Sequence, residues 1–245
     1  MIVNDIAKRF NATANDYDKL ASVQKNTAEK LIQCLRNIHP NFIPQQILDV
    51  GTGTGFVIQS LEKHFPNACY TANDIAQDML NICQKKMSSL NIKLLPGNIE
   101  TLPIAKHDLI VSNFALQWVV DLKSTLYKLY HHCNHLAFTT LVQGSLQEWY
   151  QRLQLGELNH YPSFDSLSEI IYELDPHASI QPINVTMRFA SSKAFMQYLH
   201  QLGGSASHLT APVSILKKTL QNNSPIDVSY HILLGILSRT SCTSL

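Results

Sequence analysis

The stretch ILDVGTGTGF, residues 47–56, decides the fold. An apolar run suited to a strand buried on both faces ends in an aspartate and leads into three glycines at alternate positions. Glycine lets a ligand approach the backbone closely, and the first turn of a following helix offers unpaired N–H groups. The stretch therefore predicts a strand, a ligand-binding turn and a helix, in that order.

The sequence around this stretch alternates between strand and helix patterns. The expected strands lie at 47–50, 68–73, 92–95, 108–112 and 135–142, and the helices between them at 54–64, 76–88 and 122–132. This alternation predicts an α/β fold with a doubly wound, mostly parallel, seven-stranded sheet. INVTMRF at 183–189 and YHILLGILS at 230–238 are expected to pair antiparallel at its C-terminal edge.

We expect one folded unit over residues 1–245. Its parts are an N-terminal helical cap or lid at 1–40, a cofactor-binding core at 41–142, an acceptor-side helical elaboration at 143–225 and the last strand at 226–240. Within the elaboration, helices are expected at 146–155 and 166–174.

Composition excludes several classes of protein. Hydrophobic residues make up 45% of the chain and charged residues 15%, which is enough apolar side chain for a sizeable core. The formal net charge is only +1, so no nucleic-acid partner and no anionic membrane surface are expected. The five cysteines form no CxxC pair, and no metal site is predicted. Without a signal sequence or an apolar run of 18 residues, we expect a soluble, cytoplasmic protein.

The glycine spacing separates two classes of cofactor. A dinucleotide-binding turn requires G-x-G-x-x-G, but the third glycine position of that pattern is Phe56. The observed G-x-G-x-G, preceded by Asp49, resembles motif I of the class I S-adenosylmethionine-dependent methyltransferases. Asp74, 23 residues after Gly51, and the segment LPGNIETLP at 95–103 resemble the next two motifs of that class.

The resemblance implies a Rossmann-like fold that binds S-adenosyl-L-methionine and releases S-adenosyl-L-homocysteine. It implies that Asp74 binds the ribose hydroxyls and that Asn98, which stands where an aspartate is usual, binds the adenine edge. Asp49 is expected to hold the loop through backbone hydrogen bonds. The predicted cofactor-binding residues are Asp49, Gly51, Thr52, Gly53, Gly55, Asp74, Ile75, Asn98, Ile99 and Asn113.

Segments outside these motifs indicate the acceptor. SNFALQWV at 112–119 lacks the N/D-P-P signature of base methylation. It resembles the malonyl-acyl-carrier-protein O-methyltransferases of biotin synthesis, as do AKRFNATANDYDKLASVQ at 7–24, AFTTLVQGSLQEW at 137–149 and YHILLGILSR at 230–239. The sequence departs from that family at Ala12, at Asn98 and in the turn YHHCNH before the fifth strand.

The resemblance implies methyl transfer to the free carboxylate of a malonyl thioester, carried on acyl carrier protein or on coenzyme A. A carboxylate is ionised at neutral pH, so no acid or base catalyst is expected. The residues proposed to position the acceptor are Tyr17, Gln117, Trp118, Gln143, His208 and Arg152, with Arg188 and His231 as further cationic or donor side chains.

Two other readings remain open at this point. The chain could methylate oxygen or carbon of another small molecule, with the same cofactor residues and a different acceptor pocket. It could also be a non-catalytic binding protein with the methyltransferase fold. Binding of S-adenosylmethionine separates the second alternative from the other readings, and acceptor assays separate the first.

Overall fold

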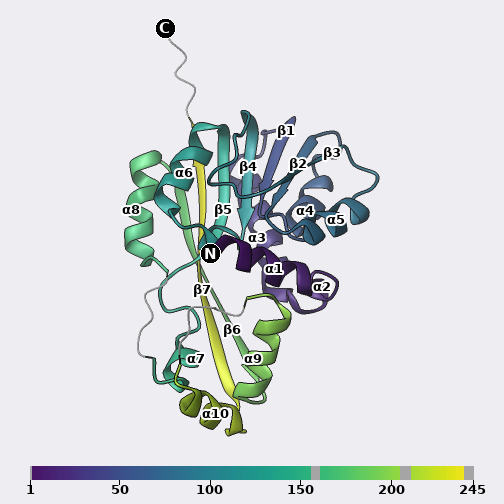
Figure 1. Ribbon diagram of the computed structural model, residues 1–245. Helices are drawn as coiled ribbons and strands as arrows, with labels where there is room; N and C mark the ends of the chain where they lie inside the picture. Colours follow the sequence, from purple (N-terminus) through teal and green to yellow (C-terminus); the bar gives the residue numbers. More distant parts are fainter. Residues whose placement is uncertain (1, 156–160, 205–210, 240–245) are drawn as a thin grey trace.

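The computed structural model describes residues 2–155, 161–204 and 211–239. Within these residues the chain folds around a seven-stranded sheet with the order β3-β2-β1-β4-β5-β7-β6 (Figure 1). The strands are β1 (Gln46–Val50), β2 (Cys69–Asp74), β3 (Ile92–Pro96), β4 (His107–Asn113), β5 (Cys133–Leu141), β6 (Ser179–Phe189) and β7 (Ile226–Ser238). The doubly wound α/β sheet predicted from the sequence is confirmed.

Helices cover both faces of the sheet and its lower end (Figure 1). They are α1 (Ile2–Thr13), α2 (Tyr17–Leu20), α3 (Ser22–Ile38), α4 (Phe56–Glu62), α5 (Gln77–Lys86), α6 (Leu122–His131), α7 (Gln147–Arg152), α8 (Phe164–Leu174), α9 (Ser192–Gln201) and α10 (Val213–Gln221), with a short 3₁₀ turn η1 (Leu116–Trp118). Among the described helices, none combines the length and the apolar character needed to cross a membrane.

The five parallel strands have apolar side chains on both faces, as buried parallel strands require. Ile47 of β1 belongs to the apolar cluster that includes Leu31 of α3 and Leu61 of α4. Its neighbour Leu48 points the other way and belongs to the cluster that includes Leu126 of α6. Each such fully buried side chain contributes about 1.5–3 kcal/mol.

The carboxyl ends of β1 and β4 lie side by side at the point where the strand order reverses. β1 pairs with β2 on one side and with β4 on the other, with Val50 opposite Asn73 and Ser112. Connections leave these two strands toward opposite faces, which opens a crevice between them. This crevice is where the ligand of such a sheet is expected.

The last two strands pair antiparallel, as the sequence predicts. β7 lies between β5 and β6, and β6 forms the edge, with Asn184 opposite His231. The segment at 143–225 is therefore not only helical, because it includes the whole of β6. Both strands continue beyond the parallel sheet, where they support a lobe of α7, α9 and α10 (Figure 1).

The N-terminal helices lie across the carboxyl ends of the strands. α1 packs against α5, and α2 packs against α9 of the lobe. The contact with the lobe is close at Gly203, where an added Cβ would lie 2.9 Å from Cδ1 of Phe10. The helical lid expected at residues 1–40 thus bridges the core and the lobe.

Candidate functional site

The glycines of the loop between β1 and α4 differ in the space that a side chain would have. Gly51 has φ +66°, and a Cβ there would lie 2.1 Å from the Cβ of Ala115. Gly53 has φ +54°, also in the left-handed region, but a Cβ there would meet no protein atom within 4 Å. Only glycine adopts both conformations readily. Gly51 is needed for packing, whereas the side of Gly53 is open.

Asp74 ties the end of β2 to this loop. The Gly53 N–H donates to its Oδ2 and the Ala76 N–H to its Oδ1, both at 2.8 Å. The side chain is buried, and burial raises its pKa while the backbone hydrogen bonds oppose that rise. Each carboxylate oxygen keeps a further lone pair for another donor.

Asp49 lies behind the loop, outside the cleft that the loop borders. The Thr52 hydroxyl donates to its Oδ2 at 2.7 Å, and its Oδ1 is buried with no hydrogen-bond partner in the described structure. Burial raises the Asp49 pKa to about 7, and the charge of Asp74 adds to the rise. Asp49 thus contacts the loop through a side chain rather than through the backbone hydrogen bonds that we expected.

Asn98 begins the turn after β3. Its Oδ1 accepts from the Glu100 N–H at 3.0 Å, and its Nδ2 donates to Glu100 Oε2 at 3.3 Å. Asn73 holds the same turn by donating through Nδ2 to the carbonyl oxygens of Leu95 and Gly97. The amide oxygen predicted to face an adenine is thus already engaged once, with one lone pair left.

Asn113 joins the sheet to the lid at the end of β4. Its Nδ2 donates to the carbonyl oxygen of Gln24 at 2.9 Å, and its Oδ1 accepts from the Thr139 hydroxyl at 2.7 Å. Gln24 is itself buried, and its side-chain Oε1 has no hydrogen-bond partner in the described structure. The Gln24 Oε1 is therefore available beside the cleft to accept a hydrogen bond from a ligand.

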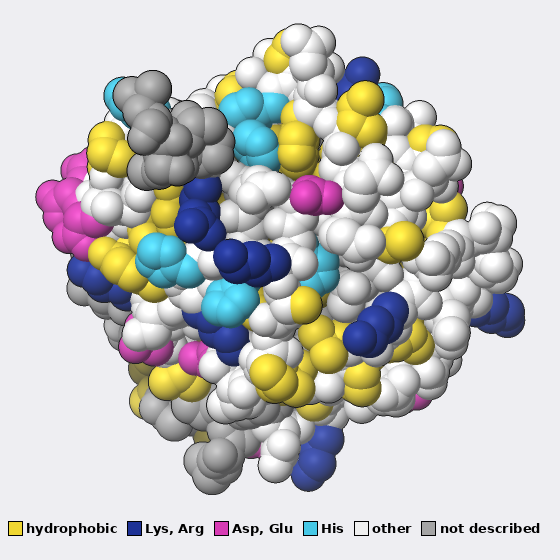
Figure 2. All heavy atoms as spheres, turned by 90° about the horizontal axis from the view of Figure 1, so that it is seen from above, with side chains coloured by type: hydrophobic (Ala, Val, Ile, Leu, Met, Phe, Trp, Pro, Cys, Tyr) yellow, Lys and Arg dark blue, Asp and Glu magenta, His cyan; other side chains and the backbone are white. Residues whose placement is uncertain are grey.

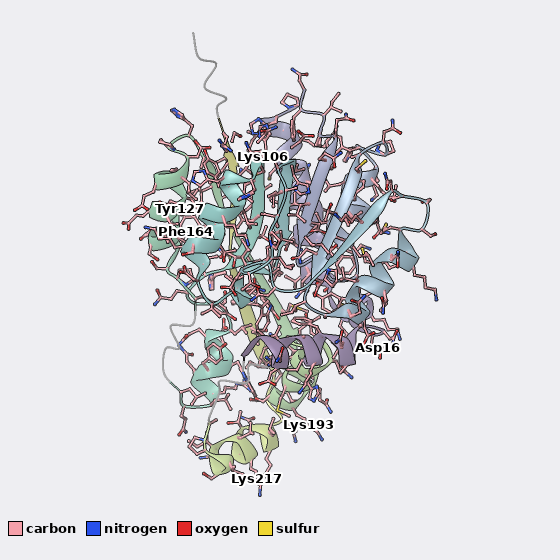
Figure 3. The ribbon with its side chains drawn as sticks, turned by 45° about the horizontal axis from the view of Figure 1, so that its top comes forward. Asp16, Lys106, Tyr127, Phe164, Lys193 and Lys217 are labelled. Atoms are coloured by element: carbon pink, nitrogen blue, oxygen red, sulfur yellow. The ribbon has the colours of Figure 1, made fainter. Side chains whose placement is uncertain are left out.

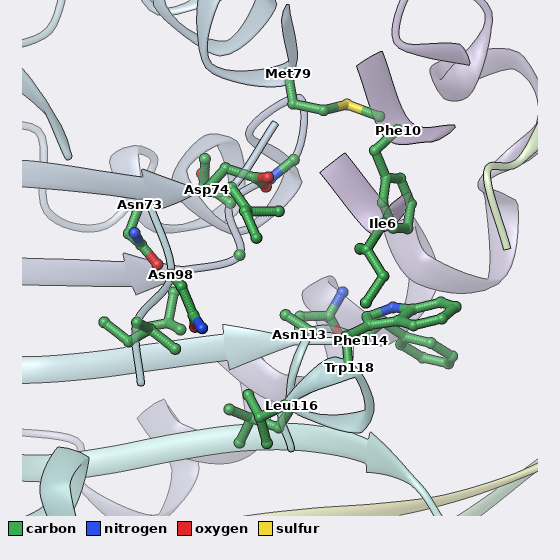
Figure 4. A pocket seen from close by; sticks show the side chains of 18 of the residues that line it. Ile6, Phe10, Asn73, Asp74, Met79, Asn98, Asn113, Phe114, Leu116 and Trp118 are labelled. Atoms are coloured by element: carbon green, nitrogen blue, oxygen red, sulfur yellow. The ribbon is translucent and has the colours of Figure 1, made fainter. Parts of the chain in front are cut away.

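A cleft at the carboxyl ends of β1–β4 brings these residues together (Figure 4). It encloses about 960 Å³ of empty space, measured out to its open mouth. The side chains of Asn73, Asp74 and Asn98 lie on one side of it, and Phe114 and Trp118 lie on the other (Figure 4). Predicted cofactor residues that line it are Gly51, Thr52, Gly53, Asp74, Ile75, Asn98, Ile99 and Asn113, whereas Asp49 and Gly55 do not.

The lid closes the cleft with aromatic and aliphatic side chains. Ile6 and Phe10 of α1 line it, and the Phe10 ring meets Trp118 edge-on at 5.7 Å. The ring of Tyr17 stacks on Phe56 at 6.2 Å. Sequence reasoning missed Ile6 and Phe10 as lining residues. Their signal was the apolar face of an amphipathic N-terminal helix.

The residues proposed to position an acceptor fall into two groups. Tyr17 and Trp118 line the cleft. Gln117 and Gln143 do not line it. The Nε2 of Gln117 donates instead to the Phe114 carbonyl. His208 lies outside the described residues.

The candidate cations are engaged elsewhere. Arg152 donates from α7 to the Ser192 hydroxyl and to the backbone carbonyls of Ser224 and Pro225. Arg188 pairs with Asp227 at 3.5 Å on the exposed surface. His231 faces Asn184 across β6 and β7. None of the three lines the cleft.

Other basic side chains gather at the end of the molecule opposite the cleft. The face at the amino-terminal ends of the parallel strands displays His, Lys and Arg side chains together (Figure 2). Lys106 projects there, whereas Lys193 and Lys217 project from the lobe at the other end (Figure 3). The cleft is thus an uncharged or acidic space between two regions that carry basic residues.

Comparisons of the sequence identify relatives. Residues 47–135 match a family model described as a methyltransferase domain. Over 98% of both chains, the sequence is 32% identical to malonyl-[acyl-carrier protein] O-methyltransferase of Neorickettsia risticii. It is 30% identical to the protein of the same name from Priestia megaterium, over 96% of this chain and 97% of that one.

Solved structures share the fold at lower identity. The YcgJ protein of Bacillus subtilis superposes with a TM-score of 0.60 at 12% identity, over 86% of this chain and 99% of that one. The plantazolicin methyltransferase BpumL, crystallised with a pentazolic substrate analogue and S-adenosylhomocysteine, gives a TM-score of 0.57 at 14% identity, over 97% of both chains. At such identities, these structures establish the fold alone.

Proposed function

The chain belongs to the malonyl-[acyl-carrier protein] O-methyltransferase family, and from that premise we propose that it methylates the free carboxylate of a malonyl thioester on acyl carrier protein. The product is the malonyl methyl ester that primes biotin synthesis. The observation that supports the proposal most is the extent of the similarity. The methyltransferase domain matches only residues 47–135, whereas the similarity to the named relatives continues through the lid and the lobe, where we expect the acceptor to bind.

The residues of the cleft fit S-adenosylmethionine, the methyl donor. Gly53 leaves open space beside the loop, and the buried carboxylate of Asp74 lies next to it, where it accepts the Gly53 N–H. Asp49 adds a second buried carboxyl group, whose pKa is raised by burial and further by the charge of Asp74. A cationic ligand suits such a pair, because a positive charge favours the ionised form of both. We propose that Asp74 binds the ribose hydroxyls and that the turn at Asn98 receives the adenine.

The reaction requires alignment rather than proton transfer. When bound, S-adenosylmethionine supplies a methyl group activated by a positively charged sulfur. Methylation forms one carbon–oxygen bond, breaks one carbon–sulfur bond and moves no proton, because the acceptor carboxylate is already ionised at neutral pH. The chain therefore has to hold the carboxylate in position and exclude water from around it.

The aromatic wall performs that second task. Phe10, Phe114 and Trp118 line the cleft with aromatic surface, which we propose keeps water away from the bound carboxylate. A carboxylate that has lost its hydration is a better nucleophile. The aromatic rings also limit the directions from which it can approach the methyl group. Tyr17, which also lines the cleft, is proposed to close over the bound ligands.

A genetic experiment tests the proposal. The chain is expressed in a bacterium lacking its own malonyl-methylating enzyme, and growth is followed without biotin. We expect growth with the native chain and none with Asp74→Ala. Asp227→Ala, the same substitution at an exposed ion pair outside the cleft, serves as the matched control and should support growth. Accumulation of folded native chain without growth would contradict the proposed substrate.

A further inference from the structure

The described residues of the cleft offer no cation to an anionic acceptor. Among the described residues, no Lys, Arg or His lines the cleft, and the side chains of Arg152, Arg188 and His231 are held elsewhere. Neutral hydrogen-bond donors are the groups that the described part of the site offers to a carboxylate. The described structure has such donors behind the aromatic wall.

Three tyrosines from distant parts of the chain converge there. Tyr17 begins α2 in the lid, Tyr198 belongs to α9 of the lobe, and Tyr230 lies on β7. Tyr17 lines the cleft directly. Tyr230 does not line the cleft but packs against Phe114, which does: the two rings meet edge-on, with 6.5 Å between their centres. We call these three residues the tyrosine cluster.

Two hydroxyls of the cluster lack partners. The Oη atoms of Tyr198 and Tyr230 are buried, and within the described structure neither has a hydrogen-bond partner. The side chains are 8% and 3% exposed. Buried polar groups in proteins are nearly always hydrogen-bonded, and each exception calls for an explanation. Two hydroxyls without a partner in the described structure, close to a ligand cleft, can donate to an acceptor that arrives with the ligand.

The electrostatics of the cluster keep these hydroxyls protonated. Burial raises the pKa of Tyr198, and it raises that of Tyr230 well above the usual value. The two hydroxyls lie close together, and their interaction opposes the rise in the Tyr198 pKa and adds to that of Tyr230. Tyr17 extends the series toward the cofactor side: burial raises its pKa most, and Asp74 and Tyr198 add to the rise. At neutral pH the cluster can donate but carries no charge.

We propose that Tyr198 and Tyr230 bind the carboxylate of the malonyl acceptor, as two neutral O–H donors reached past Phe114. The inference rests on the proposed function and names the residues that select its substrate. The tyrosine hydroxyls donate to carboxylate lone pairs that take no part in the reaction. One carboxylate oxygen is thereby left free to attack the methyl group.

Neutral donors suit this reaction better than an arginine would. A guanidinium would pair with both carboxylate oxygens and engage the electrons that have to form the new bond. Hydrogen bonds to an anion are roughly twice as strong as those to a neutral acceptor. Methylation removes the charge, so the hold of Tyr198 and Tyr230 on the ester is weaker than on the acid, and the product is released.

The test compares Tyr198→Phe and Tyr230→Phe with the matched control Tyr70→Phe. Tyr70 is a buried tyrosine of β2 whose hydroxyl donates to the Phe65 carbonyl, away from the cleft. Steady-state kinetics are measured with malonyl-acyl carrier protein, binding of S-adenosylmethionine by calorimetry, and thermal stability by circular dichroism.

Each cluster variant should raise KM for the malonyl acceptor about tenfold or more, while cofactor affinity stays within about twofold. The thermal midpoint should stay the same or rise, because the lost hydroxyl had no partner. Inhibition by the malonyl methyl ester should change less than KM for the acid. Tyr70→Phe should lower the thermal midpoint and leave KM unchanged.

Wild-type KM in both variants would overturn the inference, and so would a joint fall in thermal midpoint and cofactor affinity. The wild-type enzyme separates this failure from that of the proposed function. If it methylates malonyl-acyl carrier protein but the variants match it, only the tyrosine assignment is wrong. If it does not methylate that acceptor, the proposed function fails and the inference fails with it.

Discussion

Replacing Gly53 with alanine separates the two reasons for a glycine in the loop. Gly53 has φ +54°, and alanine in the left-handed region costs about 1–2 kcal/mol. The new methyl group would meet no protein atom within 4 Å, so no clash adds to that cost. In a domain of this size we expect the thermal midpoint to fall by about 2–4 °C for each kcal/mol lost.

The larger effect of Gly53→Ala should be on the ligand. Gly53 lines the cleft, and the space beside it is the space that we assign to the cofactor. The methyl group would displace the ligand from the loop and weaken S-adenosylmethionine binding by at least about tenfold, or about 1.4 kcal/mol. Calorimetric titration with S-adenosylmethionine and with S-adenosylhomocysteine measures this loss.

The control is Gly144→Ala. Gly144 has φ +93°, and its added Cβ would lie 3.1 Å from the His231 ring, outside the cleft. This variant should lose stability and keep its affinity for the cofactor. If Gly53→Ala binds S-adenosylmethionine as tightly as the native chain, the loop does not face the cofactor and our assignment of the cleft is refuted.

Three further changes test other parts of the site. Asp74→Ala leaves two backbone N–H groups without their acceptor, so it should lower the free energy of unfolding by about 2–5 kcal/mol and abolish measurable cofactor binding, as urea denaturation and calorimetry would show. Asp49 has its pKa raised from 3.8 to about 7 by burial, so its stabilising contribution, complete below pH 4, is lost as pH rises through 7. Asp49→Asn should therefore remove on the order of 4 kcal/mol of the decline in ligand-free stability between pH 4 and 8, and parallel pH profiles would contradict this. Arg152→Ala breaks three hydrogen bonds within the lobe, so it should lower the thermal midpoint without changing KM for the acceptor, and a selective rise in KM would return Arg152 to the acceptor site.

Much of the core could be predicted because local chemistry determines it. The apolar run before Gly51 suits a strand buried on both faces, and the spacing of the glycines favours S-adenosylmethionine over a dinucleotide. The edge pairing of β6 and β7 was also predictable, since both segments are long and rich in β-branched residues. The extent of α7 was not predictable. We expected a helix at 146–155, but α7 begins at Gln147, because Leu146 adopts φ +61°.

The acceptor side depends on contacts that the sequence does not display. An amphipathic α1 shows that one face is buried, but not that Phe10 covers a cleft. The charge of Arg152 suggested an anion site, yet its direction depends on backbone carbonyls more than 70 residues away in the chain. Tyr198 and Tyr230 meet only because α9 folds back along the last two strands. Each of these depends on tertiary packing rather than on local pattern.

The central claim is that this chain methylates a malonyl carboxylate, and mass spectrometry of the carrier protein tests it most directly. Purified chain is incubated with methyl-labelled S-adenosylmethionine and either malonyl- or acetyl-acyl carrier protein. We predict that the malonyl carrier gains one labelled methyl group and that the acetyl carrier, which lacks a free carboxylate, gains none. Equal labelling of both carriers, or labelling of neither, would contradict the account.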